Sequence, residues 1–489
     1  MEWSYGLLTD AEQAVLRRLA VCAGGCTLEA AEAVCVGAGV GDEGDEGVVT
    51  LLARLIDKSL LTLEERNGRG RYRLLETVRQ YGWEQLEAVR EATEAQQRHQ
   101  DWSLALAEAA EQQLTGPDQV TWLTRLEGDH DNLRAALTWT RETGQSARGL
   151  RLAGALWRFW YTRGYLSEGR QWLEELLTLA PQNDDAGAAT VRATALNAAG
   201  VLARSQGDYA PAVALSTASL RLCRDGGDRQ GSANALANLG NVACDQGVYG
   251  QAIALFEESL ALRRDSTDAW GTANALNALG MIALDQGDYE RAAALLTDSL
   301  ALKRARGDTQ GIATALTNLG GVALDVGDYP RAVVLLEESV ALKRALGDPW
   351  SLAISVINLA HVARKQTAWG QAITLYTRSL ALYWGVGHKV GVAMALEYLA
   401  GCICLRGQPQ RAVRLLGAAA TLRTAIGIPI LLPDRADHER AMAATRGVLG
   451  NDAFAAAWAA GQSLALERVM TEALTDAAEP ATAPLPARS

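Results

Sequence analysis

The sequence is poor in phenylalanine, contains few lysines, and has no long hydrophobic run. It has 489 residues with 3 phenylalanines, and 57 Asp and Glu against 46 Lys and Arg give a formal net charge of −11. This charge argues against a general nucleic-acid or membrane-surface binder, because such binding depends on clustered Lys and Arg. No apolar stretch is long enough to span a bilayer and no signal peptide is apparent, so we expect a cytoplasmic protein without a membrane partner.

Motifs that carry chemistry are also missing. We find no Gly-rich phosphate loop followed by Lys, no HExxH and no GxSxG. The seven cysteines form no CxxC pair and have no His at metal-ligand spacing, which favours buried thiols over a metal or redox site. Asp129-His130-Asp131 has no nucleophile nearby in the sequence, so helix capping explains it better than a catalytic relay. We therefore expect no catalytic residue, no metal and no cofactor, and a chain that is not an enzyme.

What the sequence does contain is a repeat of forty residues in its C-terminal half. Self-similarity at a fixed period in this range predicts a solenoid, which offers a long concave surface instead of a reaction pocket. Four series define the repeat: Gly200, Gly240, Gly280, Gly320, Ala360 and Ala400; Gly207, Gly247, Gly287, Gly327 and Gly407, interrupted by Thr367; Tyr209, Tyr249, Tyr289, Tyr329 and Trp369; and Ala212, Ala252, Ala292, Ala332, Ala372 and Ala412.

The rest of the chain divides around this array. Helical patterns followed by a strand, a turn at Asn67-Gly68 and a second strand predict a small winged-helix domain at the N-terminus, with a Gly- and acid-rich loop from Gly37 to Gly47. An Ala- and Pro-rich tail predicts disorder. The predicted parts are a winged helix over 1–82, a helical bridge of degenerate repeats over 83–189, six repeats over 190–427, capping helices over 428–476 and a disordered tail over 477–489.

Polar residues recur within the first helix of each repeat. Asn234, Asn238, Asn241 and Asp245 fall at i, i+4, i+7 and i+11, which predicts that they share one helix face. Since first helices line the inner wall of a helix-pair solenoid, we expect this face to form a groove. The other predicted groove residues are Asn197, Arg204, Asn274, Asn277, Asp285, Asn318, Asp325, Asn358, His361, Arg364, Lys365, Glu397 and Tyr398.

Two explanations account for asparagine at these places, where it is a poor helix former. Its carboxamide can pair with the main chain of an extended peptide, which points to a protein or peptide ligand in the groove. It can also join neighbouring repeats by hydrogen bonds. The series Asp245, Asp285, Asp325 leads into His361, Arg364 and Lys365, and such opposite charges would orient a partner.

Several tryptophans and one tyrosine lie outside these patterns. Trp157, Trp160 and Tyr161 stand at i, i+3, i+4 and so are expected on one helix face, as an aromatic core or as a ligand box. Trp270 and Trp350 occupy a position that other repeats fill with Gln, just before the first helix. They are either contacts for a partner or covers over the adjacent loop.

The repeats resemble tetratricopeptide repeats of the longer, kinesin-light-chain type. Leu279-Gly280, Gly287-Asp288-Tyr289, Ala292 and Ser299-Leu300-Ala301-Leu302 carry the resemblance, which recurs in phase over 190–427. Together with the N-terminal prediction it implies a mainly α fold, in which a small winged-helix domain precedes a right-handed tetratricopeptide-repeat α-solenoid.

The N-terminal part resembles the winged helix of bacterial STAND ATPases, the NB-ARC relatives described as LuxR-type or AfsR-type regulators. The matching segments are Trp3-Ser4-Tyr5, Asp57-Lys58-Ser59-Leu60-Leu61, Tyr72 to Tyr81 and Asp131-Asn132-Leu133-Arg134. The resemblance implies the sensor half of such a regulator, with a nucleotide-binding ATPase domain expected in the full-length protein. Where the family often has Met-His-Asp, this chain has Leu74-Leu75-Glu76, so the histidine that would contact nucleotide is missing.

The leading hypothesis is a non-enzymatic protein-interaction and signal-sensing module. One alternative is a small-molecule effector sensor of a transcription regulator. Another is DNA binding through the winged helix, but acidic residues outnumber basic ones over 1–82 and no Arg- or Lys-rich recognition helix is apparent.

Overall fold

The computed structural model describes residues 2–36, 47–66, 69–180, 186–264, 268–427, 430 and 432–474. The loop expected from Gly37 to Gly47, apart from Gly47 itself, and the tail expected over 477–489 lie outside them. The chain forms two compact units, Met1–Tyr161 with Tyr165–Gly271, and Thr162–Gly164 with Thr272–Ser489. Each unit is described by itself.

The first unit begins with a winged helix. Thr9 starts its second helix with a capping box, since Glu12 donates its backbone N–H to the Thr9 hydroxyl and accepts the Thr9 N–H in return. The two strands are antiparallel, with Leu61 opposite Leu74, so alternate side chains reach the core. The elements are α1 (Glu2–Gly6), α2 (Asp10–Leu19), α3 (Leu28–Cys35), α4 (Val48–Asp57), β1 (Leu61–Arg66), β2 (Arg69–Leu74) and α5 (Glu76–Ala88).

Five helices follow: α6 (Ala92–Gln113), α7 (Gln119–Gly128), α8 (His130–Glu142), α9 (Ser146–Arg163) and α10 (Leu166–Leu179). A buried polar network joins them to the winged helix. Arg71 of β2 donates to the carbonyls of Gly24 and Gly25 and to the Asp129 carboxylate, and Asn132 of α8 donates to Gly25 and Asp129. Because these groups leave water together and satisfy one another, they fix the winged helix on α8.

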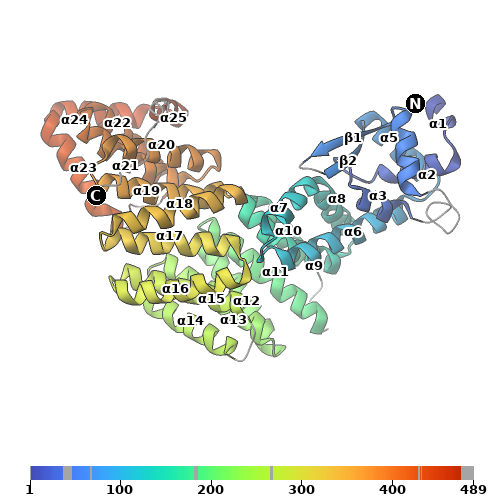
Figure 1. Ribbon diagram of the computed structural model, residues 1–489, viewed down its shortest axis with the longest axis horizontal. Coiled ribbons are helices and arrows are strands. Elements are labelled where there is room, and N and C mark those ends of the chain that lie inside the picture. The colour runs from blue at the N-terminus through green and yellow to red at the C-terminus, as the bar shows by residue number, and fades with distance from the viewer. Residues whose placement is uncertain are drawn as a thin grey trace. The chain divides into compact units, whose positions relative to one another are not determined.

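Six helix pairs form the repeats, and the pairs of the second unit stack one on the next (Figure 1). The first two pairs belong to the first unit, and α15 begins in that unit. The pairs are α11 (Ala186–Ser205) and α12 (Tyr209–Asp225), α13 (Arg229–Asp245) and α14 (Tyr249–Arg263), α15 (Ala269–Asp285) and α16 (Tyr289–Arg306), α17 (Thr309–Asp325) and α18 (Tyr329–Leu346), α19 (Pro349–Lys365) and α20 (Trp369–Gly385), and α21 (Lys389–Leu405) and α22 (Pro409–Ile426).

The turn inside each pair needs a left-handed residue. Gly287 and Gly327 have φ of 78° and 84°, values that glycine adopts without steric cost. The same place in the fifth repeat holds Thr367, which adopts φ 60°. A β-branched residue is strained in this conformation.

Small residues let the two helices of a pair approach closely. A Cβ atom at Gly320 would lie 2.7 Å from Leu336 Cγ, and one at Gly280 would lie equally close to Leu296 Cγ. Glycine at these two positions therefore allows the close packing of the two helices.

A serine on the second helix of each of the first five pairs ties the pair together; α22 has Ala419 at this place. Its hydroxyl donates to a first-helix carbonyl 26 residues earlier, over 2.7–3.0 Å. We call these contacts the serine clips. They join Ser219 to Ala193, Ser259 to Ala233, Ser299 to Ala273, Ser339 to Ala313 and Ser379 to Ala353.

One turn further along the second helices lies a buried cation. Lys343 is 3% exposed, and its Nζ donates to Thr317 Oγ1, Ser355 Oγ and the Ser351 carbonyl. Burial lowers the pKa of Lys343 to about 8. Arg263, Lys303 and Arg423 occupy the same place in their repeats and are also buried.

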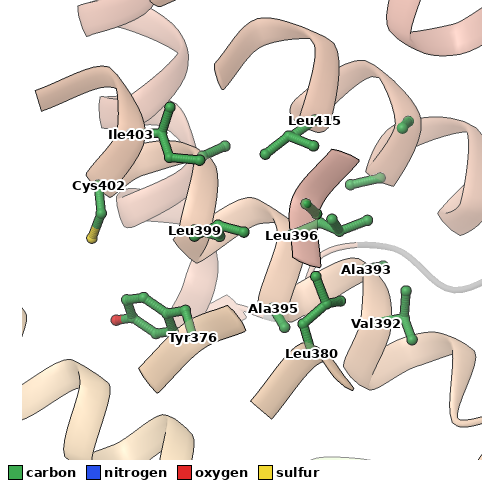
Figure 2. Packing of buried hydrophobic residues seen from close by; sticks show 14 of the residues in the cluster. Tyr376, Leu380, Val392, Ala393, Ala395, Leu396, Leu399, Cys402, Ile403 and Leu415 are labelled. Carbon is green, nitrogen blue, oxygen red and sulfur yellow. The ribbon is translucent and has the colours of Figure 1, made fainter. Parts of the chain in front are cut away.

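Three helices follow the last repeat: α23 (Leu432–Leu449), α24 (Asn451–Ser463) and α25 (Leu466–Leu474). Val469, Met470 and Ala473 of α25 join the hydrophobic core of the last two repeats. Figure 2 shows part of that core, with Leu380, Leu396 and Leu415 packed between helices. These helices therefore cover apolar side chains that the last repeat would otherwise expose.

Candidate functional site

In each unit, the partly exposed side of the first helices carries most of the predicted groove residues, on α11 and α13 in the first unit and on α15, α17, α19 and α21 in the second. We call it the first-helix face. Asp245, Asp285, Asp325 and Lys365 are exposed, whereas Asn238 and Glu397 are buried. The half-buried residues are Asn197, Arg204, Asn234, Asn241, Asn274, Asn277, Asn318, Asn358, His361, Arg364 and Tyr398.

Two of the predicted positions are wrong. Asn238 is 3% exposed and donates to Ser216 Oγ of α12 over 2.7 Å. Glu397 is 7% exposed and forms a two-pronged ion pair with Arg423 of α22 at 2.7 and 2.8 Å. Both side chains therefore bind a second helix, and in this conformation neither meets a ligand.

Other polar residues join neighbouring first helices. In the first unit, Arg204 of α11 donates to Asp245 of α13 over 3.0 Å, and in the second unit, Asn318 of α17 donates to Asn277 of α15 over the same distance. Each pair is 41 residues apart in the sequence. Asn234 accepts from the buried Arg263 over 2.7 Å. The structure thus supports the explanation in which these residues hydrogen-bond within the array.

Charged residues stand at the carboxyl ends of consecutive first helices in the second unit. α15 ends at Asp285, α17 at Asp325 and α19 at Lys365. An aspartate is disfavoured there, because the helix dipole places partial negative charge at that end. Burial raises the pKa of Asp325, Lys365 opposes the rise and Asp285 adds to it. The three side chains therefore interact electrostatically. Along this row, the ends of α15 and α17 carry negative charge and the end of α19 carries positive charge.

An aromatic group adjoins the basic end. The Tyr376 hydroxyl of α20 lies 2.7 Å from His361 Nδ1 of α19, and the Tyr398 ring of α21 packs edge-on against the His361 ring with centroids 4.5 Å apart. Burial, with help from Arg364 and Lys365, lowers the pKa of His361 to about 3. The imidazole is therefore neutral near pH 7 and can accept the Tyr376 hydroxyl proton in a hydrogen bond.

Tyr376, which comes from a second helix, is not among the residues predicted from the sequence; it is 0% exposed, so it supports His361 from within the core and does not itself line the surface. Figure 2 shows its ring at the edge of the core, with the hydroxyl directed away from Leu396 and Leu399. One signal was available, since the matching positions of the second, third and fourth repeats hold Phe256, Leu296 and Leu336, although the first repeat has Ser216. A phenol in a series of apolar residues indicates a hydrogen-bond partner nearby.

The winged helix contains a cavity of about 360 Å³ beside Leu74-Leu75-Glu76. Both arginines that line it face carboxylates, since Arg79 pairs with Glu76 at 2.6 Å and Arg73 lies 4.0 Å from Glu64. Leu75 replaces the histidine that the resemblance expects. These residues do not fit a nucleotide phosphate, so we assign no nucleotide contact to the cavity.

The exposed surface of α4 offers little positive charge for DNA binding through the winged helix. Val49, Thr50 and Ala53 are exposed on it, and its one basic residue is Arg54. Such a surface lacks the cationic side chains that bind the phosphate backbone.

Within the described ranges, no three His, Cys, Asp or Glu side chains come together in a way that could hold a metal ion. Cys22, Cys26 and Cys35 are buried in the core of the winged helix. None of the described helices is long and apolar enough to cross a bilayer.

Two segments of the chain match known protein families. The winged helix-turn-helix domain family matches residues 8–87. The tetratricopeptide repeat family matches residues 190–265, 231–305, 271–345 and 311–384.

Among curated proteins, a Mycobacterium tuberculosis protein named as an HTH-type transcriptional regulator (Rv0890c) is 40% identical over 196 residues. The match covers 40% of this chain and 22% of that protein, so the chain spans about a fifth of the relative's length. An uncharacterised M. tuberculosis protein (Rv0894) is 47% identical over 94 residues, which cover 19% of this chain and 23% of the relative.

Among solved structures, the STAND protein with a tetratricopeptide repeat sensor from Pyrococcus horikoshii has a similar fold. The TM-score is 0.54 at 15% identity, and the alignment covers 97% of this chain and 66% of that one. The chain is therefore a winged helix-turn-helix domain followed by a solenoid of tetratricopeptide repeats.

Proposed function

We propose that the chain is a non-enzymatic sensing module of a STAND-type ATPase regulator. Its repeats bind a protein or peptide on the first-helix face, and the winged helix contacts a nucleotide-binding domain. The matches to tetratricopeptide repeats support a binding function, and the charge arrangement of the second unit supports the contact proposed here.

The observation that carries the proposal is the row of Asp285, Asp325 and Lys365. Aspartate at a helix carboxyl end costs roughly 0.3–1 kcal/mol, so packing alone gives no reason for two consecutive repeats to hold it. Contact with a partner gives a reason, because an acidic and a basic end fix the direction in which a charged peptide lies. The neighbouring Tyr398 ring adds apolar area for a peptide side chain.

Two observations support the regulator part. The relative named as a transcriptional regulator is far longer than its match with this chain, as expected if further domains accompany the shared region. Leu75 is 59% exposed on the winged helix and lies at the cavity. An exposed apolar side chain beside a cavity supports a contact with another domain. We propose that this domain is the ATPase.

The groove assignment is testable by peptide selection against the immobilised full chain. Peptides selected by the native chain are expected to bind at least tenfold more weakly to the double charge reversal Asp325→Lys with Lys365→Glu. The control is Arg304→Glu with Glu338→Arg, which reverses an exposed ion pair between the second helices α16 and α18. Selection of no peptide, or equal binding to both variants, would refute the assignment. Binding of a metabolite in calorimetry, or salt-sensitive binding of duplex DNA, would favour the alternatives.

The regulator part has its own test in the coding DNA. Reading the frame upstream of Met1 is expected to reveal a Gly-rich phosphate loop ending in Gly-Lys-Ser or Gly-Lys-Thr. A stop codon directly upstream, without a separately encoded ATPase beside it, would contradict this part of the proposal.

A further inference from the structure

The four first helices that end in the second unit stop at one position of the repeat, and the residue there changes from copy to copy. α15 ends at Asp285, α17 at Asp325, α19 at Lys365 and α21 at Leu405. All four side chains are exposed, and Leu405 is 59% exposed. We call these four residues the carboxyl-end row. Leu405 adds an apolar member to the three charged ones.

Each first helix of the row contacts the next one directly. α17 is joined to α15 by the 3.0 Å hydrogen bond from Asn318 to Asn277, and to α19 by the hydroxyls of Thr317 and Ser355, which lie 2.9 Å apart. α19 meets α21 through an aromatic contact with ring centroids 4.5 Å apart. Helices in direct contact have axes roughly 8–10 Å apart, so successive members of the row are separated by about that distance.

A polyproline II helix matches this spacing with all its contacts on one side. It has three residues per turn and rises about 3.1 Å per residue, so side chains three residues apart lie along one edge at intervals of roughly 9 Å. A β-strand does not match, because its same-face side chains recur about every 6.6 Å.

An α-helix matches the row only at every seventh residue, at intervals of about 10.5 Å. Its main-chain groups are already paired with one another, whereas a polyproline II helix leaves its carbonyl groups open to a partner. Gln286 and Gln366 follow Asp285 and Lys365 directly and are exposed, so their carboxamides can bind such groups beside the row. The row therefore favours the polyproline II conformation.

The amino-terminal ends of two of these helices contact side chains of the chain itself. Arg158 Cζ lies 4.0 Å from the ring centre of Trp270 at the start of α15. Trp350 at the start of α19 lies against the His388 ring, with centroids 6.2 Å apart. These contacts support the explanation that both tryptophans cover adjacent parts of the chain, so we place the partner at the carboxyl ends.

We propose that the carboxyl-end row binds a polyproline II segment of a partner protein with the pattern basic-x-x-basic-x-x-acidic-x-x-apolar. The basic side chains meet Asp285 and Asp325, the acidic one meets Lys365, and the apolar one covers Leu405. The pattern can run in either chain direction, because side chains and not the main chain fix its order. This inference rests on the proposed function and names the class of its peptide ligand.

Synthetic peptides test the order and the conformation, with binding to the full chain measured by fluorescence anisotropy. Lys-Pro-Pro-Lys-Pro-Pro-Glu-Pro-Pro-Leu or its reversed sequence is expected to bind. The same residues arranged as Lys-Pro-Pro-Glu-Pro-Pro-Lys-Pro-Pro-Leu should bind at least about fivefold more weakly, because two attractive charge contacts become repulsive. Removing one proline from each spacer should also weaken binding, since the contacting side chains then leave their common edge.

Variants of the chain locate the peptide on the row. Lys365→Glu should reverse the preference at the third contact, so that the peptide with Lys in place of Glu binds more tightly. Leu405→Ser should remove the effect of replacing the peptide Leu by Ser. Val334→Ser is the matched control, since Val334 is a 65% exposed apolar residue of the second helix α18, and it should leave that effect unchanged.

Equal binding of the ordered and the rearranged peptides, or a preference that Lys365→Glu leaves unchanged, would overturn the inference. Tighter binding of a helical peptide with the same residues at every seventh position would overturn the polyproline II conformation. If peptides from the selection bind through Asp325 and Lys365 but the proline-spaced peptides do not, this inference alone fails. If neither kind of peptide binds, the proposed function fails with it.

Discussion

Arg71 and Asp129 form a buried ion pair, with Nη1 of the arginine 3.0 Å from Oδ1 of the aspartate. The pair connects the second strand of the winged helix to the residue that precedes α8. Its side chains are 10% and 1% exposed, so neither charge is solvated if the other is removed. The winged helix and the helical bridge are therefore joined by charge as well as by apolar contact.

Removing one partner of this pair tests the junction. Asp129→Asn is expected to lower the free energy of unfolding by about 3–5 kcal/mol, because it leaves the Arg71 charge buried and uncompensated. Arg73→Met is the control on the same strand, since its exposed contact with Glu64 should cost less than about 1 kcal/mol. Urea denaturation measures both, and equal small losses would show that the junction does not depend on the ion pair.

The strained turn of the fifth repeat gives a stabilising prediction. Thr367→Gly is expected to raise the free energy of unfolding by about 0.5–1 kcal/mol, since it removes the cost of a left-handed β-branched residue and adds the smaller entropic cost of glycine. The reverse change at the matching turn, Gly327→Thr, should lower stability. Thermal denaturation of the two variants checks the pair, and a lower melting temperature for Thr367→Gly would contradict the prediction.

Two adjacent glycines of α17 should respond in opposite directions to alanine. Gly320→Ala places a methyl group against Leu336 and is expected to cost about 1–3 kcal/mol. At Gly321 the nearest atom would be 3.8 Å from the new Cβ, so Gly321→Ala should stabilise the helix by up to about 1 kcal/mol. If the two variants had similar stability, helix propensity and not close packing against Leu336 would govern the effect of alanine at Gly320.

The buried Lys343 predicts a dependence of stability on pH. Its folded pKa of about 8 lies below the ordinary value of 10.5, so between these pH values the unfolded chain binds a proton that the folded chain does not. The contribution of Lys343 to stability therefore rises with pH across this window, and below pH 8 its full penalty of up to about 3 kcal/mol applies. The free energy of unfolding of Lys343→Met should therefore exceed that of the native chain most at pH 7, and the difference should shrink progressively toward pH 10.

Lys303 offers an independent check of this effect. It is equally buried, and burial lowers its pKa to about 8 as well, so Lys303→Met should show the same trend. Urea denaturation at several pH values measures the difference from the native chain. A difference that stays constant with pH in both variants would contradict the prediction.

Regular features of the fold could be predicted from the sequence, because most repeats hold the same residue types at the same positions. The period indicated a solenoid of helix pairs, and the four residue series marked positions that recur from pair to pair. Even the exception was visible, since Thr367 interrupts the series where the structure has a strained turn. Local rules of helix ends and packing act the same way in every copy.

The orientation of individual polar side chains could not be predicted in this way. Asn238 and Asn318 occupy matching positions, yet Asn238 is buried and Asn318 is half-buried. The residue 22 positions earlier is Ser216 in one case and Leu296 in the other, so only Asn238 finds a hydrogen-bond partner on the second helix. Glu397 was misplaced for a similar reason, since its partner Arg423 lies on another helix. Replacing Asn234, Asn238, Asn277 and Asn318 together by alanine would therefore disturb packing as well as a surface.

The serine clips bear on how such an array changes length. Each clip begins and ends inside one repeat, since donor and acceptor are 26 residues apart in a period of forty. Inserting or deleting a whole copy would therefore leave every remaining clip intact. The contacts that must be matched anew are those 41 residues apart, where one copy meets the next. The number of repeats can therefore change by insertion or deletion of whole copies. Selection then acts chiefly on the residues at the contacts between one copy and the next.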